Sequence, residues 1–170
     1  MSGPNRRRFL QASLAAGATF AISGTKSSGN ILGANDRVRV AVAGLHGRGR
    51  SHYGAYAKMK DVEVAYVVDP DSRQFARAIS EIKNISGTAP KPIGDVREVL
   101  DDKELNVVSI ATPNHWHSLI GVWACQAGKD AYIEKPISHN VFEGGQLAAA
   151  ARKYNRIVQH GTQQRLSLIH

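Results

Sequence analysis

The sequence predicts an α/β fold built on a doubly wound, parallel β-sheet. Three observations support this prediction. Short apolar, β-branched runs alternate with helical patterns along most of the chain, a glycine-rich turn follows the first run, and polar residues directly follow the later runs. Alternating strands and helices form parallel sheets through right-handed crossovers, and such sheets bind ligands at the carboxyl ends of their strands.

Strands are predicted where β-branched and other apolar residues cluster between turn residues. The first run ends at Gly44, and the second is closed by Asp69-Pro70-Asp71. The predicted strands are residues 38–43, 62–68, a short strand near 93, 107–111, 131–133 and 157–159.

Helices are predicted where apolar residues recur at spacings of three and four. Asp71 and Asp95 are expected to cap the second and third helices, because an Asp side chain accepts hydrogen bonds from first-turn N–H groups. Gly128 ends the fourth helix, and residues 111–117 before it are expected to form a loop. The predicted helices are residues 50–60, 71–85, 95–100, 119–127 and 142–154.

Composition indicates one globular domain that does not bind nucleic acid. The 170 residues are 42% hydrophobic, and the net charge is +8. Arg6, Arg7, Arg8 and Lys26 lie in the first 34 residues, which contain no acidic residue, so the rest of the chain carries only +4. These charges are scattered and form no basic stripe. Cys125 is the only cysteine, which excludes an intrachain disulfide, and we expect it to be a buried helix residue.

The first 34 residues have the pattern of an export signal and a linker, and we exclude them from the fold. Arg6 and Arg7 precede Phe9-Leu10 and an apolar stretch over residues 10–22, as in twin-arginine signals. That stretch is too short to span a bilayer. The prediction is an exported protein of the periplasm or cell envelope, with no membrane span; a basic tail, amphipathic or disordered, is the alternative.

The run Gly44-Leu45-His46-Gly47-Arg48-Gly49 lies between the first predicted strand and the first helix. Glycines in this position let the backbone approach a pyrophosphate, and the following helix N-terminus attracts the anion. Asp69 ends the second strand, twenty residues beyond Gly49, where a carboxylate can bind ribose hydroxyls and repel a 2′-phosphate.

The cofactor predicted from this turn is therefore NAD, with NADP possible. Arg73 is the counter-argument, since it could pair with a 2′-phosphate, although we expect it to be a solvated helix residue. His46 departs from the usual fingerprint, because it stands where the second glycine belongs. A strand-to-helix turn without any ligand is the alternative.

With these motifs together, residues 36–165 resemble the Gfo/Idh/MocA oxidoreductases. The resemblance is carried by the glycine turn, Asp69 and three further runs, which are Ala-Thr-Pro-Asn-His-Trp-His at 111–117, Glu134-Lys135-Pro136 and Gly161-Thr162-Gln163. It implies a Rossmann-like NAD(P)-binding domain over residues 35–160. It also implies a second, α+β domain for the substrate that begins within residues 161–170.

The resemblance implies roles for matching residues. The turn glycines would lie under the pyrophosphate with His46 beside it, Asp69 would hold the adenosine ribose, and residues of the 111–117 run would line the wall near the ribose and nicotinamide. Glu134 and Lys135 would reach the nicotinamide end, where the Lys135 ammonium, as the catalytic group, could stabilise charge on a substrate oxygen. The implied cofactor-binding residues are Gly44, His46, Gly47, Gly49, Asp69, Thr112, Pro113, Asn114, His117, Glu134 and Lys135.

Plainer roles remain open for some of these residues. Lys135 could form a surface ion pair, and Glu134 could be a structural carboxylate. His115 and His117 do not have metal-ligand spacing, so no metal site is predicted. Trp116 and Trp123 are expected to be packing residues rather than stacking platforms.

The function predicted from the resemblance is the cofactor-binding portion of an exported NAD(P)-dependent oxidoreductase that acts on a sugar or cyclitol hydroxyl. An NAD-dependent glycosidase of the same fold and a non-catalytic nucleotide-binding module are the alternatives. The general acid/base would lie in the second domain, so we expect the 170 residues to be an inactive fragment. We also expect these 170 residues to self-associate through exposed apolar surface. For the full-length protein, a homo-oligomer is one of the expected states.

Overall fold

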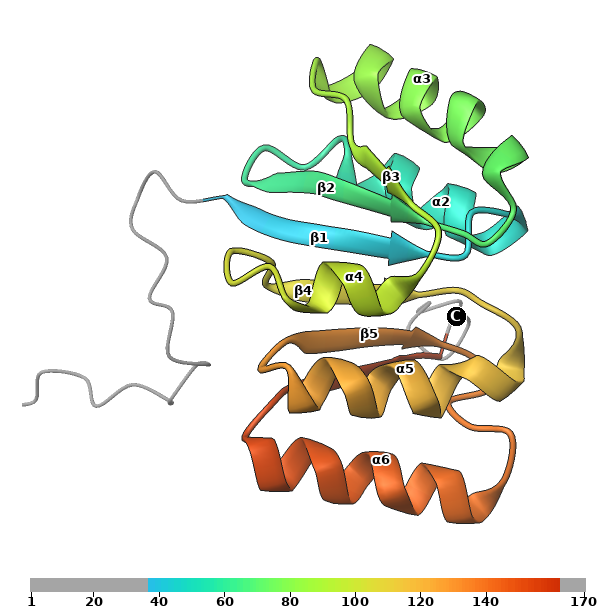
Figure 1. The fold of residues 1–170 in the computed structure, drawn as a ribbon, viewed down its shortest axis with the longest axis vertical. Coiled ribbons are helices and arrows are strands. Elements are labelled where there is room, and N and C mark those ends of the chain that lie inside the picture. The colour runs from blue at the N-terminus through green and yellow to red at the C-terminus, as the bar shows by residue number, and fades with distance from the viewer. Residues whose placement is uncertain (1–36, 163–170) are drawn as a thin grey trace, which may run out of the picture. The chain divides into compact units, whose positions relative to one another are not determined.

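The computed structural model describes residues 37–162, so the predicted signal over residues 1–34 lies outside the described residues. Six strands form one sheet in the order β3-β2-β1-β4-β5-β6, and every neighbouring pair is parallel (Figure 1). The strands are β1 (Val38–Ala43), β2 (Val62–Val68), β3 (Lys91–Ile93), β4 (Val107–Ile110), β5 (Asp130–Glu134) and β6 (Val158–Gly161). This confirms the predicted doubly wound α/β fold.

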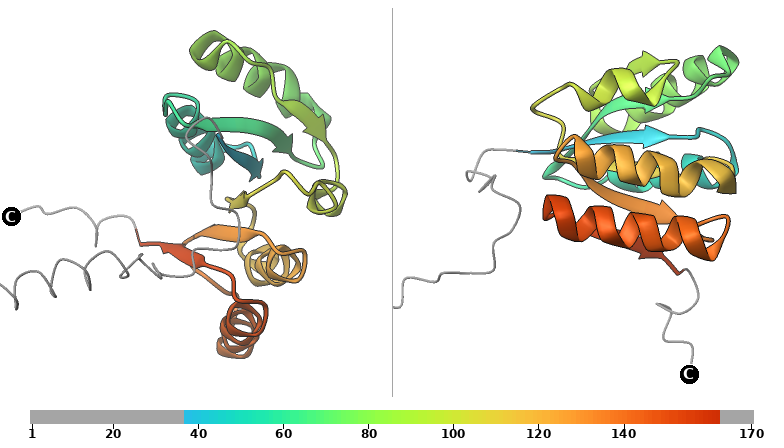
Figure 2. Two further views of the ribbon diagram at one scale, coloured as in Figure 1. Left: turned by 90° about the vertical axis from the view of Figure 1, so that its left-hand side faces the viewer. Right: turned by 60° about the horizontal axis from the view of Figure 1, so that its bottom comes forward.

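Helices cover both faces of the sheet (Figure 2). One core contains side chains of α2 (Gly47–Tyr56) and α3 (Phe75–Ser86), and the other contains side chains of α4 (Val96–Leu100), α5 (Asn114–Gln126) and α6 (Val141–Tyr154). β1 serves both cores, because side chains alternate between the faces of a strand. Val40 and Val42 face α2 and α3, whereas Ala41 and Ala43 face the other core.

The order of the strands places a topological switch point between β1 and β4. From β1 the chain winds outward to β2 and β3, and it then crosses the sheet to β4 and winds outward in the opposite direction. The loops that leave β1 and β4 therefore diverge at the carboxyl edge, where open α/β sheets form their ligand crevices.

The largest difference from the predicted elements concerns α5. It begins at Asn114, five residues before the predicted start, so the expected loop over residues 114–117 is the first turn of a helix. The N-cap is Pro113, which makes no side-chain capping bond, so the N-cap position itself carries no Ser, Thr or Asp signal of a helix start.

Smaller differences occur in the first half of the fold. Helix α2 begins at Gly47 instead of residue 50, because three glycines obscure its periodicity. Asp71 does cap, as predicted, but it caps a short 3₁₀ turn (Ser72–Gln74) that precedes α3. Asp95 caps α4, and Cys125 is buried in α5, both as predicted.

The backbone of the glycine turn packs against its surroundings without room for a methyl group. Gly44 has a φ of +85°, and a Cβ there would lie 2.6 Å from the carbonyl oxygen of Ala111. A Cβ on Gly49 would lie 1.7 Å from the carbonyl oxygen of Gly44. Glycine is therefore required at both positions for β1, α2 and β4 to meet.

Replacing Gly49 with Ala should lower the free energy of unfolding by about 1–3 kcal/mol, the usual cost of overpacking, because the backbone of Gly44 must move. Chemical denaturation of the purified chain measures this. Gly145→Ala is the matched control, since Gly145 is exposed in α6 and a Cβ there meets nothing within 4 Å. The control should raise the free energy of unfolding, by up to about 1 kcal/mol. Equal stability of G49A and the unchanged protein would show that the turn adapts.

Candidate functional site

The turn between β1 and α2 forms the first part of the candidate site. The first N–H groups of a helix have no intrahelical partners and carry the positive end of its dipole, which suits them to an anion. His46 is the N-cap residue and makes no side-chain capping bond. Its imidazole is exposed, and Nε2 lies 4.0 Å from Oδ2 of Asp71. A Cβ on Gly47, the first helical residue, would meet nothing within 4 Å.

Asp69 holds this turn in place. It is 6% exposed at the end of β2. Its Oδ2 accepts a hydrogen bond from the N–H of Leu45 at 2.9 Å, and its Oδ1 accepts one from the N–H of Asp71 at 2.9 Å. The carboxylate thus fastens the glycine turn to the loop after β2, a contact that the sequence did not predict. Whether it also binds ribose hydroxyls stays a prediction.

Arg73 lies at the surface, as a solvated residue. Its guanidinium pairs with Asp71, with Nε 2.7 Å from Oδ1 and Nη2 3.0 Å from Oδ2. The hydrogen bonds from Arg73 and then from Gln74 hold the pKa of Asp71 well below its usual range. The loop after β2 therefore presents a carboxylate that stays charged at neutral pH.

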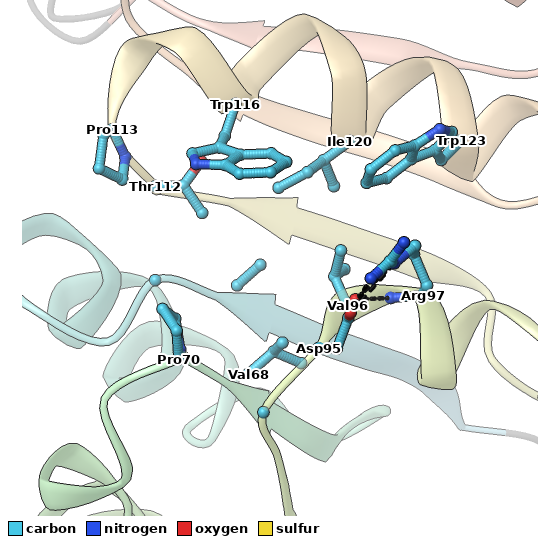
Figure 3. Close-up of a pocket in the computed structure, with 13 residues that line it drawn as sticks. Val68, Pro70, Asp95, Val96, Arg97, Thr112, Pro113, Trp116, Ile120 and Trp123 are labelled. Carbon is cyan, nitrogen blue, oxygen red and sulfur yellow. Dashed lines mark hydrogen bonds and ion pairs between the residues drawn. The ribbon is translucent and has the colours of Figure 1, made fainter.

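A cavity of about 350 Å³ opens at the switch point (Figure 3). This volume lies within the range of small-molecule pockets. The cavity begins at the turn, at Gly44, and extends between the loops after β2, β3 and β4 toward α4 and α5. Its lining residues are Ala43, Gly44, Val68, Pro70, Gly94, Asp95, Val96, Arg97, Thr112, Pro113, Trp116, Ile120 and Trp123.

Both tryptophans of the chain line this cavity, and Trp123 also packs against the hydrophobic core, as expected of a packing residue. Figure 3 shows Trp116, Ile120 and Trp123 along α5 on one side, with Val68, Pro70 and Asp95 across from them. Trp116 is 41% exposed, so an aromatic face is available to a ligand. Arg97 lies 5.8 Å above the ring of Trp123.

The residues after β4 shape the mouth of the cavity. Pro113 and Asn114 are exposed, and the Oγ1 atom of Thr112 is buried without a hydrogen-bond partner. His117 is only 1% exposed, and its ring nitrogens lie 2.6 Å from the carbonyl oxygen of Pro136 and 2.8 Å from that of Thr112. His117 therefore fastens the loops after β4 and β5 to each other, and its ring nitrogens face these carbonyls.

Lys135 is exposed directly after β5, whereas the Glu134 side chain beneath it is buried. The Oε1 atom of Glu134 lies 2.8 Å from Nε of Arg48 and 3.0 Å from Nε2 of His52. Its Oε2 atom accepts the N–H of Lys135 at 3.1 Å. Glu134 therefore joins the end of β5 to the glycine turn and α2.

Arg48 and His52 are site residues that the sequence reasoning missed. The available signal was a polar stripe at positions 48, 52 and 56, which are neighbours on one helix face directly after the glycine turn. His52 is 6% exposed, and its Nδ1 lies 3.0 Å from Oγ of Ser109. Burial lowers the pKa of His52, although Glu134 opposes this shift.

Among residues 37–162, no group of three His, Cys, Asp or Glu side chains could hold a metal ion. No helix in the same part of the chain is long and apolar enough to cross a membrane.

Comparisons with known proteins agree with this geometry. A family model described as "Oxidoreductase family, NAD-binding Rossmann fold" matches residues 38–162. Glycosyl hydrolase family 109 protein 2 from Shewanella sp. (strain ANA-3) is 28% identical over 176 residues. That alignment covers 92% of this chain but 39% of the relative, so the chain spans about two fifths of its length.

Solved structures show the same fold. An NAD binding oxidoreductase from Klebsiella pneumoniae is 29% identical, with a TM-score of 0.65, over 74% of this chain and 34% of that one. The myo-inositol 2-dehydrogenase from Lactobacillus plantarum has a TM-score of 0.68 at 24% identity, over 78% of this chain and 38% of that one. At that identity the likeness shows the fold alone.

Proposed function

The chain belongs to the Gfo/Idh/MocA family of oxidoreductases, as an NAD-binding Rossmann domain, and we propose that it serves an enzyme that moves a hydride between NAD and a carbinol carbon of a sugar or cyclitol. The observation that carries the proposal is the cavity at the switch point, which begins at Gly44 of the glycine turn. Bound NAD would supply the hydride acceptor. The chain's own residues bind and orient it.

The residues of the site fit a dinucleotide. A Cβ on Gly47 would meet open space, so this glycine leaves room for an approaching diphosphate, and the N-terminus of α2 offers its N–H groups. The unpartnered Oγ1 of Thr112 is available to a hydrogen-bonding ligand. The apolar cavity beside Trp116 and Pro70 suits an adenosine group, because aromatic faces stack on bases.

Lys135 lies at the end of β5, across β4 from the turn, and we assign it to the nicotinamide end. An ammonium there can stabilise negative charge on a substrate oxygen as hydride leaves the carbinol carbon. Glu134 is buried beneath it, so its role is to position this segment rather than to touch the substrate.

We expect NAD rather than NADP as the cofactor. The carboxylates of Asp69 and Asp71 both lie in the loop that follows β2, where a 2′-phosphate would meet like charge. Arg73 is occupied by Asp71 and is therefore poorly placed to compensate.

A glycosidase is the second candidate, because a relative that aligns with 92% of the chain is named a glycosyl hydrolase. A transient oxidation of a sugar hydroxyl would begin with the same hydride step, so the cofactor site described above serves either reaction. The Glu134-Lys135-Pro136 run favours the dehydrogenase, because it is one of the motifs on which the resemblance to the oxidoreductase family rests.

We also propose export by the twin-arginine route. The proposal rests on the run from Asn5 to Gln11 and the apolar stretch after it. This route carries folded proteins, which suits an enzyme that binds its dinucleotide before it leaves the cytoplasm.

The chain should bind NADH about tenfold or more tightly than NADPH, as measured by calorimetry, because of the carboxylates after β2.

NAD⁺ and ADP should also quench its intrinsic fluorescence, since both tryptophans line the cavity. Trp116→Leu should weaken the binding of ADP and of NADH to the same extent and remove most of the quenching. A well-folded chain that binds neither nucleotide would refute the proposed function, and tighter binding of NADPH would refute the role of the carboxylates.

A protein that joins this domain to a substrate domain should reduce NAD⁺ in the presence of a sugar or cyclitol, with one NADH formed per substrate oxidised. A glycosidase would instead release the aglycone of an aryl glycoside with no net change in NADH. Following absorbance of NADH and of the released aglycone in one assay separates the two. Lys135→Ala should lower the rate of NADH formation far more than the affinity for NADH, because the ammonium acts on the substrate oxygen.

Replacing Arg6 and Arg7 together with lysine should abolish export of the protein and leave it in the cytoplasm. Cell fractionation with immunodetection measures this. Lys26→Arg is the control, since Lys26 lies after the apolar stretch and its replacement keeps the charge. Unchanged export of the double-lysine variant would show that these residues are not a twin-arginine signal.

A further inference from the structure

We propose that Arg48 is a positioning residue that couples the glycine turn to Lys135 through the buried carboxylate of Glu134. The inference rests on the proposed function, because that function assigns Lys135 to the nicotinamide end. It concerns a cluster of residues from α2, β4 and β5, which we call the Glu134 cluster: Arg48, His52, Tyr56, Ser109, Tyr132 and Glu134.

The two oxygens of Glu134 face different parts of the site. Oε1 lies 2.8 Å from Nε of Arg48, which belongs to the glycine turn, and 3.0 Å from His52. Oε2 accepts the main-chain N–H of Lys135 at 3.1 Å. Because a carboxylate is rigid and planar, a displacement of Arg48 turns both oxygens. Movement at the turn is thereby transmitted to the backbone of Lys135.

The charge of the cluster shows why Arg48 is needed. Glu134 is 3% exposed, and a buried carboxylate is costly unless a cation neutralises it. His52 touches the same oxygen, but burial and then the nearby Arg48 lower its pKa, against the opposing effect of Glu134. The imidazole is therefore neutral at pH 7, and the positive charge is that of Arg48.

The groups around His52 agree with a neutral ring. With Nε2 protonated, it donates to Glu134, while Nδ1 accepts from the hydroxyl of Ser109, which in turn lies 3.4 Å from the Tyr56 hydroxyl. The ring of Tyr132 packs edge-on against the imidazole, with centroids 5.3 Å apart. These groups, with Arg48, are the polar neighbours from α2, β4 and β5.

Arg48 also reaches solvent, which a purely structural pair does not require. Its side chain is 48% exposed, although its Nε contacts a buried oxygen. The guanidinium carries five N–H donors, so one edge can hold Glu134 while others face the ligand side of the turn. A dinucleotide bound at the turn and a correctly placed Lys135 would then favour each other.

The first test compares the binding of NADH and ADP by calorimetry, because ADP occupies the turn but lacks the nicotinamide end. Glu134→Gln should weaken the binding of NADH about fivefold and change the affinity for ADP less than twofold. Arg48→Gln should also weaken the binding of NADH more than that of ADP. The variant that carries both changes should bind NADH no worse than the weaker-binding single variant, because both changes remove the same contact between Arg48 and Glu134. Arg48→Lys keeps the charge and should restore part of the affinity.

Arg50→Gln is the matched control. Arg50 follows two residues later in the same helix, and its exposed guanidinium pairs with Glu81 at 2.6 Å, away from the Glu134 cluster. This variant should bind NADH and ADP as the unchanged chain does.

The second test follows the imidazole of His52 by NMR during a pH titration of the chain without ligand. Arg48→Gln should raise the pKa of His52, because the repulsion between Arg48 and a protonated imidazole is lost. Glu134→Gln should lower this pKa further, and Arg50→Gln should leave it unchanged. His52→Asn identifies the signal. If Glu134→Gln does not fold, both the nucleotide affinities and the pKa of His52 are measured on Arg48→Gln alone.

Additive effects of the two changes on NADH affinity, or equal losses for NADH and ADP, would overturn the inference and leave the proposed function standing. An unchanged pKa of His52 in Arg48→Gln would also overturn it. If the unchanged chain bound neither nucleotide, the proposed function would fail and the inference with it.

Discussion

The close approach of two chain segments at the start of the sheet is the constraint on which the rest of the structure depends. The turn after β1 passes so near to β4 that a Cβ on Gly44 would lie 2.6 Å from the carbonyl oxygen of Ala111, and Gly49 rests directly on Gly44. This contact sets where α2 begins and which way its N-terminus points. The buried carboxylate of Asp69 then fixes the turn through the N–H of Leu45.

From this contact the site extends in two directions along the carboxyl edge. On the side of β2 and β3, the apolar cavity beside Trp116 suits a flat, aromatic group. On the side of β5, the exposed Lys135 stands above a buried carboxylate that is bonded to the turn. The groups of a dinucleotide follow the same order, since its diphosphate joins an adenosine at one end to a nicotinamide at the other. The topology of the sheet alone brings these parts together, because β1, β4 and β5 are adjacent.

The relatives place this arrangement in a wider context. The chain is similar in sequence to proteins named as glycosyl hydrolases, and it shares its fold with a protein named as a myo-inositol 2-dehydrogenase. The chain covers about two fifths of these proteins. A shared fold does not specify a shared reaction. The hydride step that we propose would be common to both reactions.

The sequence by itself determined the alternation of strands and helices, the glycine turn, the Asp caps of the 3₁₀ turn and α4, and the burial of Cys125, because each depends on local spacing and backbone preference. It did not reveal the start of α5, since Pro113 caps without a side-chain bond. Only the tertiary structure decided that Asp69 holds Leu45, that His117 joins two loops, that Trp116 lines a cavity and that Glu134 pairs with Arg48 and His52. These contacts join residues 24 to 86 positions apart in several cases, and no local signal specifies which buried polar groups will meet. They form because a polar or charged group that is buried on folding loses its hydrogen bonds to water and must be hydrogen-bonded within the protein instead.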